Sequence, residues 1–173
     1  MNINVAAEYR GLGEAIEDME AMLERDDDVL FRTVPALSNW SPAHHLYHVA
    51  LSDGRMCKAI QAICAGHERA SQTPELNKIG LHILMTEDMM RGRGKAPGMV
   101  VPPDTVSRPD LEKTLARCRS KYAEIEALLP SLPAQAKGLP HPFMGVLGAK
   151  EWLRLARIHS RHHLAIMREL IEA

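Results

Sequence analysis

Two histidines, His159 and His163, stand one helical turn apart near the end of the sequence. The segment around them, residues 151–170, has no Gly or Pro, and its apolar residues recur every three to four positions. This spacing is the pattern of an amphipathic helix. Residues i and i+4 of a helix lie on one face with their Cβ atoms about 5–6 Å apart. Two imidazoles held in this way can bind one metal ion if a third ligand comes from elsewhere in the fold.

A second group of histidines, on a helix predicted from about residue 41 to residue 65, offers that third ligand. Ser41 is a good N-cap, and the proline after it fits the first helical position, where its missing N–H costs nothing. His48 is the best candidate, because a ligand must reach the core from the inner face of the helix. His44 lies near the start of the helix, and His45 lies about 100° round the axis from it.

Three neutral imidazoles with positions left open for water are typical of a catalytic divalent metal site. Zinc and nickel suit histidine-rich sites best, and the ion would lower the pKa of bound water or of a bound thiol. In the alternative interpretation these histidines are ordinary core residues, and the chain is a non-catalytic helical bundle that acts through dimerisation or a protein partner. We expect His67, His82 and His162 on the surface or behind the ligands.

The elements that must position these histidines are all predicted to be helical. The predicted helices cover about residues 4–25, 41–65, 73–90, 107–130 and 148–170. Thr73 is expected to cap the third of these helices, with Pro74 at its first position. No alternating strand pattern and no hairpin turn signal is evident. The sequence therefore predicts an all-α fold, a four-helix bundle with one additional short helix, as a single domain over residues 1–173. Bundles build metal sites in their core from facing helices.

Composition excludes several classes of function. The 21 basic and 22 acidic residues leave a net charge of -1, without the basic excess of a nucleic-acid-binding protein. No apolar run reaches the roughly 18 residues of a membrane span. The glycines of the basic loop at residues 91–103 are not spaced for phosphate binding. The three cysteines form no CxxC pair, and the N-terminus has no signal-peptide pattern. We therefore expect free thiols and a cytoplasmic protein.

Three patches of the sequence resemble the DinB/YfiT-like superfamily. Residues 40–50 (WSPAHHLYHVA) resemble the opening of the second helix in that family, with the pattern W-S-x-x-x-x-(apolar)-x-H-(apolar)-A. Residues 159–163 (HSRHH) resemble its H-x-x-H-H motif, whose first and last histidines bind metal. Residues 141–152 (HPFMGVLGAKEW) are similar to a lead-in segment, H-P-x-x-G-x-L-x-x-x-x-W, seen in one branch of the family.

The resemblance implies a four-helix bundle that binds one divalent metal ion through His48, His159 and His163. Characterised relatives include thiol transferases that use low-molecular-weight thiols and a thiol-dependent maleylpyruvate isomerase. The resemblance thus implies a metal-dependent transferase or hydrolase that acts on a small molecule, and a homodimer, since dimers are common among relatives. Many relatives have an Asp or His soon after the first ligand, where this chain has Ser52 and Asp53, and a Gln where this chain has Ile166.

Overall fold

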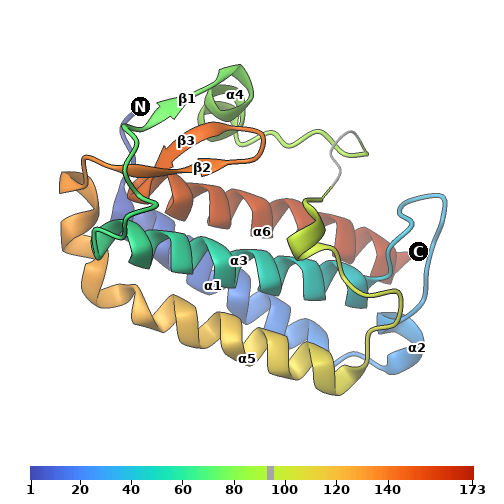
Figure 1. Ribbon diagram of the computed structural model, residues 1–173. Coiled ribbons are helices and arrows are strands. Elements are labelled where there is room, and N and C mark those ends of the chain that lie inside the picture. The colour runs from blue at the N-terminus through green and yellow to red at the C-terminus, as the bar shows by residue number, and fades with distance from the viewer. Residues whose placement is uncertain (93–95) are drawn as a thin grey trace.

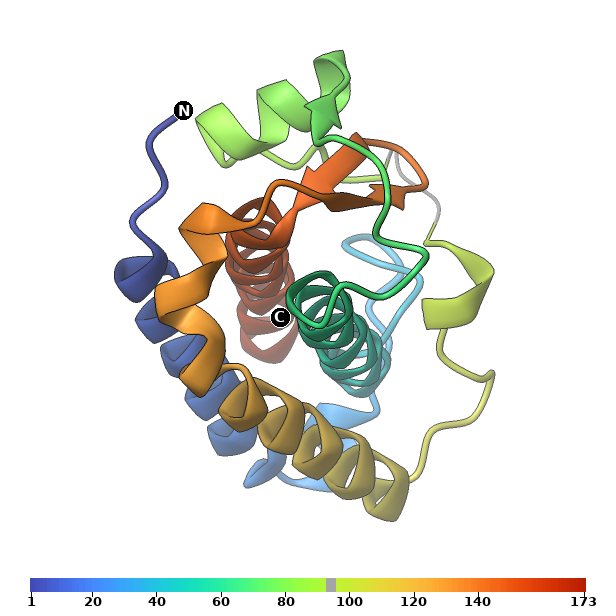
Figure 2. The ribbon, with the colours of Figure 1, turned by 60° about the vertical axis from the view of Figure 1, so that its left-hand side comes forward.

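Four long helices form a bundle with one long crossover connection in the computed structural model, which describes residues 1–92 and 96–173. They are α1 (Val5–Leu23), α3 (Pro42–Cys64), α5 (Arg108–Glu124) and α6 (Ala149–Glu172). Each packs against two others, in the cyclic order α1, α6, α3, α5 (Figure 2). α3 and α5 run opposite to α1 and α6, so α3 is antiparallel to α6 (Figure 1). The predicted all-α bundle is confirmed.

The starts of the long helices follow their capping residues. Ser41 accepts a hydrogen bond from the backbone N–H of His44 at 3.4 Å, and Pro42 occupies the first turn of α3. Asn4 caps α1 in the same way, and Ser107 and Asp110 form a capping box at the start of α5. The predicted start of α3 is therefore confirmed.

The long connection between α3 and α5 lies over one face of the bundle together with a small sheet (Figures 1 and 2). The connection contains β1 (Glu75–Leu76), α4 (Lys78–Thr86) and the 3-10 helix η1 (Gly98–Val100). β2 (Gly138–His141) and β3 (Gly145–Gly148) form an antiparallel hairpin just before α6, and β1 pairs with β3 on the other side. The strand order is β1-β3-β2.

The sequence-based prediction was wrong in this connection and at the end of α5. The third helix does not begin at Thr73, because Glu75 and Leu76 pair with Val146 and Gly145 as strand β1. Asn77 caps α4 instead, accepting the N–H of Gly80 at 2.9 Å, and the helix ends at Thr86. The fourth long helix is also shorter than predicted. The 3-10 helix η2 (Glu126–Ala134) replaces its last turn and contains both Pro130 and Pro133.

Smaller elements and surfaces complete the description. The short helix α2 (Asp27–Leu30) lies between α1 and α3. All three cysteines are free, as predicted, and Cys57 and Cys118 belong to the hydrophobic core. Within the described ranges, no helix is both long and apolar enough to cross a membrane. The basic loop predicted over residues 91–103 includes residues 93–95, which lie outside the described residues.

Candidate metal centre

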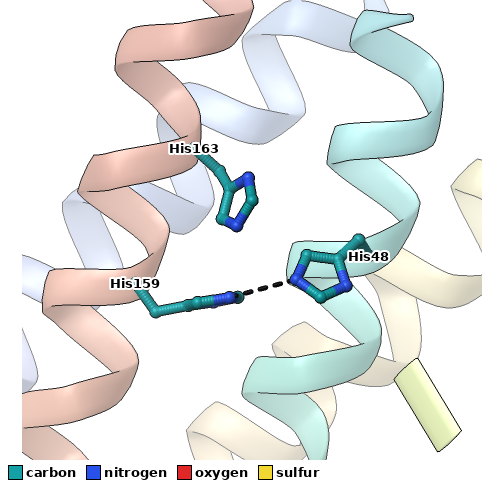
Figure 3. Close-up of side chains that lie close together, drawn as sticks. All are labelled: His48, His159 and His163. Atoms are coloured by element: carbon teal, nitrogen blue, oxygen red, sulfur yellow. Dashed lines mark hydrogen bonds between the residues drawn. The ribbon is translucent and has the colours of Figure 1, made fainter. Parts of the chain in front are cut away.

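The structure brings His48, His159 and His163 together in the core of the bundle. His48 projects from α3, while His159 and His163 project from consecutive turns of α6 and face it (Figure 3). Each ring offers one nitrogen, and these nitrogens lie within 4.8 Å of one another. His48 and His159 are buried, and His163 keeps partial exposure as a residue although its ring nitrogen is enclosed. We call these three residues the histidine cluster.

The tautomer of His48 follows from a backbone contact. Nδ1 of His48 lies 2.7 Å from the carbonyl oxygen of Val100, in η1. A carbonyl oxygen only accepts, so Nδ1 must carry the proton. In the neutral ring Nε2 then has a lone pair, and it lies 3.1 Å from Nε2 of His159.

His159 is backed by a buried carboxylate. Its Nδ1 lies 3.9 Å from Oδ1 of Asp53, and neither atom has a hydrogen-bond partner among the described residues. The other oxygen of Asp53 accepts the hydroxyl of Ser160 at 2.6 Å. A proton on Nδ1 is the arrangement that suits the facing carboxylate, and it leaves a lone pair on Nε2. The separation is longer than a hydrogen bond, but the carboxylate lies on the outer side of the ring, where metal sites place such a group behind a histidine ligand.

His163 has a different kind of partner. Its Nδ1 lies 2.9 Å from Nδ1 of His45, and Nε2 of His45 lies 2.9 Å from Oγ of Ser38. The indole ring of Trp40 packs against this side of the cluster, with its centroid 5.1 Å from that of His48 and 5.3 Å from that of His45. The outer nitrogen of each ring in the histidine cluster therefore faces a group from another part of the chain.

The environment keeps the three rings neutral. Burial lowers the pKa of His159 to about 4, and burial together with the neighbouring His159 lowers the pKa of His48 to about 4. The pKa of His163 is held well below its usual value by burial and by the surrounding histidines. Complete burial raises the pKa of Asp53 to about 7, although the hydrogen bond from Ser160 and the nearby His48 act in the opposite direction. Neutral imidazole is the form that binds a metal ion.

These residues fit a divalent cation. Nε2 of His48 and Nε2 of His159 lie 3.1 Å apart. With a proton on Nε2 of His159 this contact is a hydrogen bond, and with a proton on Nδ1 both lone pairs face the same point and can bind a cation there. Tetrahedral coordination at about 2.0–2.1 Å places two ligand nitrogens about 3.3 Å apart, close to this separation. The orphaned pair of Asp53 Oδ1 and His159 Nδ1 is explained in the same way, as the outer support of a ligand.

Four further histidines are not members of the histidine cluster. His44 turns away, with Nδ1 2.7 Å from Oγ of Ser41 and Nε2 3.3 Å from the carbonyl oxygen of Asp104. His67 and His82 are exposed, as expected, and His162 is half-buried beside His163. Ile166 is buried.

Sequence reasoning missed two contributors to the site, Val100 and the pair formed by Ser38 and His45. Val100 acts through its backbone carbonyl, so no side-chain motif marks it. Helix spacing placed His45 about 100° round the axis from His44 and gave it no role in the site. The turn before α3 brings Ser38 back against it, and only the assembled bundle brings it against His163.

A second polar cluster includes two arginines from the N-terminal half of α6. We call it the ion-pair cluster; it consists of Glu8, Glu87, Arg154 and Arg157. Glu8 accepts hydrogen bonds from both arginines, and Glu87 also bonds both, at 2.9 Å from Arg154 and 2.9 Å from Arg157. Glu8 and Arg157 are almost completely buried. Gly11 makes room, since a Cβ there would lie 2.7 Å from Cδ of Arg157.

Comparison with known families agrees with the geometry. The family model described as the DinB superfamily matches residues 12–167, and the chain therefore belongs to the DinB superfamily. The match spans the helices that carry all three members of the histidine cluster. Searches of curated proteins and of solved structures found no match for this chain.

Proposed function

We propose that this protein is a metal-dependent enzyme that holds one divalent ion, zinc or nickel, through His48, His159 and His163. One observation carries the proposal: three imidazole nitrogens from two helices converge within 4.8 Å while their outer nitrogens face other groups. The hydrogen bond between His48 and His159 accounts for two of these nitrogens without a metal, whereas a bound ion accounts for the convergence of all three. Membership of the DinB superfamily supports the same assignment.

The reaction that we propose is a thiol-dependent transfer, or a hydrolysis, on a small molecule. A divalent ion in this site lowers the pKa of a coordinated thiol or water and polarises a substrate oxygen. The chain itself supplies three neutral ligands, so the charge of the ion is not neutralised by the protein. Burial of the cluster strengthens its electrostatic effect on a bound thiol, since less water screens it. A low-molecular-weight thiol is the proposed cosubstrate, and no nucleic acid or membrane partner is proposed.

A pocket near the cluster supports a small-molecule substrate. It has a volume of about 400 Å³ and is lined by residues 87–91 together with Ile158, Arg161 and His162 of α6. The ring of His162 lies 5.1 Å from that of His163, centroid to centroid. The lining is of mixed charge, since Glu87 and Asp88 accompany the two arginines, and Arg91 is already paired with Glu169.

Metal content tests the proposal directly. Protein purified under metal-replete conditions should hold about one equivalent of zinc or nickel per chain, and His48→Ala, His159→Ala and His163→Ala should each lose it. His82→Ala is the matched control, because it also removes an imidazole ring but from an exposed position on α4. Equally low metal in the wild type and in the three variants would show that the site does not exist.

An activity screen tests the second half of the proposal. The zinc-loaded and nickel-loaded proteins would be assayed with a panel of thiols, each paired with electrophilic acceptors, and with hydrolysable esters and amides. Turnover should require the metal and should disappear in His159→Ala. Turnover that survives removal of the metal would contradict a metal-dependent mechanism.

A non-catalytic bundle that acts through a second copy or a protein partner is the alternative. One observation favours it: large apolar side chains are exposed on α4 and on the turn between β2 and β3, including Ile79 (55%), Met85 (62%) and Phe143 (49%). Light scattering at several concentrations would test for the proposed homodimer. An unchanged melting temperature with and without chelator would favour this alternative, because a metal that binds only the folded state must raise it. The free cysteines support a reducing, cytoplasmic location for either function.

A further inference from the structure

His45 is a buried histidine that the proposed metal site does not use as a ligand. It stands on the first turn of α3, three residues before His48, and only 4% of its surface is exposed. Its ring bridges two groups, with Nδ1 2.9 Å from Nδ1 of His163 and Nε2 2.9 Å from Oγ of Ser38. The backbone N–H of Trp40 donates to the same Ser38 oxygen at 3.0 Å. The result is a continuous row of hydrogen bonds that ends at one member of the histidine cluster.

A row of neutral imidazoles can point its hydrogen bonds in either direction. In one direction, Ser38 donates to Nε2 of His45, and His45 then donates from Nδ1 to Nδ1 of His163. In the other, His163 donates from Nδ1 to His45, and His45 donates from Nε2 to Ser38. Each neutral ring has one N–H and one lone pair, so the direction of the row determines which nitrogen of His163 is free.

Only the second direction is compatible with metal binding. If His45 donates to His163, the proton of His163 sits on Nε2, which faces His48 and His159 and could not then bind an ion. If His163 donates, Nε2 has the lone pair. Ser38 can accept from His45 while it also accepts from Trp40, because a hydroxyl oxygen has two lone pairs. His45 therefore supports His163 as Val100 supports His48 and as Asp53 supports His159.

We propose that His45 is a positioning residue, which accepts the Nδ1 proton of His163 and thereby turns the Nε2 lone pair of His163 toward the metal. The inference rests on the proposed metal site. His45 differs from Val100 and Asp53 in one respect. A carbonyl and a carboxylate only accept a hydrogen bond, whereas an imidazole also donates one. Ser38 can accept from His45 in this direction, and metal binding selects that direction from the two available.

His45 is not itself a fourth ligand in this arrangement. Its Nδ1 faces the outer nitrogen of His163, on the far side of that ring from the cluster. The group of nitrogens that share one position within the described residues contains His48, His159 and His163 and does not contain His45.

The test compares variants that remove or keep an acceptor at this position. His45→Leu removes it, while the side-chain oxygen of His45→Gln can accept the same proton. His44→Leu is the matched control, because His44 is the adjacent histidine and contacts Ser41 and Asp104 instead. Zinc affinity would be measured by competition with a chromophoric chelator. We expect a loss of about 10–100-fold for His45→Leu, substantial rescue in His45→Gln and little change in His44→Leu.

A second readout follows the tautomer itself. Long-range ¹H–¹⁵N spectra of the imidazole rings distinguish a proton on Nδ1 from a proton on Nε2. In the wild type, zinc-loaded His163 should carry its proton on Nδ1. In the metal-free protein, His45→Leu should shift His163 toward the other tautomer, and Ser38→Ala should do so less strongly. Ser38→Ala also serves as the second variant if His45→Leu does not fold.

The outcomes separate this inference from the proposed function. If the wild type binds zinc and His45→Leu binds it with the same affinity and the same His163 tautomer, His45 has no positioning role and the inference fails. If His45→Gln is as weak as His45→Leu, the hydrogen bond is not the cause and the inference also fails. If the wild type binds no zinc, the metal site itself is wrong, while the tautomers of the metal-free protein still show whether His45 controls His163.

Discussion

Helix α6 contributes to two buried polar clusters, and they differ in what they lack. In the ion-pair cluster both arginines contact both glutamates, so positive and negative groups satisfy one another. In the histidine cluster the three rings are neutral, and each turns a nitrogen toward the same point. One cluster is complete within the protein, whereas the other could hold a cation that the protein does not supply. The contrast separates a cluster of paired charges from a cluster of neutral groups that fits a metal ion.

The largest effect is expected from acid, which should destabilise the fold much more through the buried histidines than through the ion-pair cluster. Five histidines have pKa values lowered to about 4, mainly by burial: His45, His48, His141, His159 and His162. Their unfolded value is about 6.5, so the unfolded chain binds more protons between these limits and stability is lost as the pH falls from about 6.5 toward 4. Asp53, whose pKa is raised to about 7, acts in the opposite direction in this range, but it is one group against these five histidines and His163, whose pKa is also lowered.

The metal-free protein should therefore unfold before the pH reaches 4. Urea unfolding at pH 7, 6, 5 and 4 would measure the loss, and the zinc-loaded protein should resist acid over the upper part of this range. The ion-pair cluster should contribute little above about pH 5, because arginine stays charged and the hydrogen bonds from Arg157 hold the pKa of Glu87 below its usual value, so that Glu87 stays charged in this range. Constant stability from pH 7 to pH 4.5 would contradict the lowered histidine pKa values.

Removal of Glu8 should cause the largest loss of any single substitution in the ion-pair cluster. Among the described residues, Glu8→Leu leaves the half-exposed Glu87 as the acidic partner of Arg154 and Arg157, while Arg154 keeps its hydrogen bond to the carbonyl oxygen of Leu84. Breaking a buried ion pair from one side costs about 3–5 kcal/mol of the free energy of unfolding. Urea unfolding in the presence of chelator would measure it, and the folded fraction should keep its zinc stoichiometry. Loss of metal from folded Glu8→Leu would mean that the two clusters are not independent.

Zinc should stabilise the wild type by a smaller amount. At a free zinc concentration 100 times the dissociation constant, the expected gain is about 2.7 kcal/mol. The gain should vanish in His159→Ala and persist in His82→Ala, as measured by the melting temperature with and without chelator. An equal gain in His159→Ala would place the zinc elsewhere on the protein.

The smallest effect is expected on the surface. Arg168 and Asp18 form an ion pair at 2.7 Å, and both side chains are more than half exposed. Solvent screens such a pair, so Asp18→Ala should cost less than about 1 kcal/mol and should leave zinc binding unchanged. A cost as large as that of Glu8→Leu would show that burial does not explain the difference between the two pairs.

The sequence predicted the parts of the molecule that local signals determine. Ser41 followed by a proline predicted the start of α3, and the spacing of His159 and His163 predicted that they share a face of α6. Both predictions depend on helix geometry over one or two turns, which the sequence specifies directly. The proximity of His48 to this pair needed only the assumption that α3 and α6 are neighbours, and the bundle has these helices in contact.

The parts that were missed depend on contacts between distant segments. Thr73 with Pro74 and Asn77 are both good helix starts, and only the pairing of Glu75 with Val146 decides between them. β2 is four residues long and includes Pro140, so it has no room for an alternating pattern. His45 was placed correctly on its helix, but its role depends on Ser38 in the preceding turn and on His163, 118 residues away.

The backbone contact of His48 affects how the site tolerates mutation. The group that orients His48 is the carbonyl of Val100, which every amino acid provides, so a substitution at this position removes a side chain and leaves the acceptor in place. The proposed support of His163 is a side chain, which a single base change can eliminate. Random mutagenesis should therefore remove the proposed support of His163 more often than it removes the support of His48.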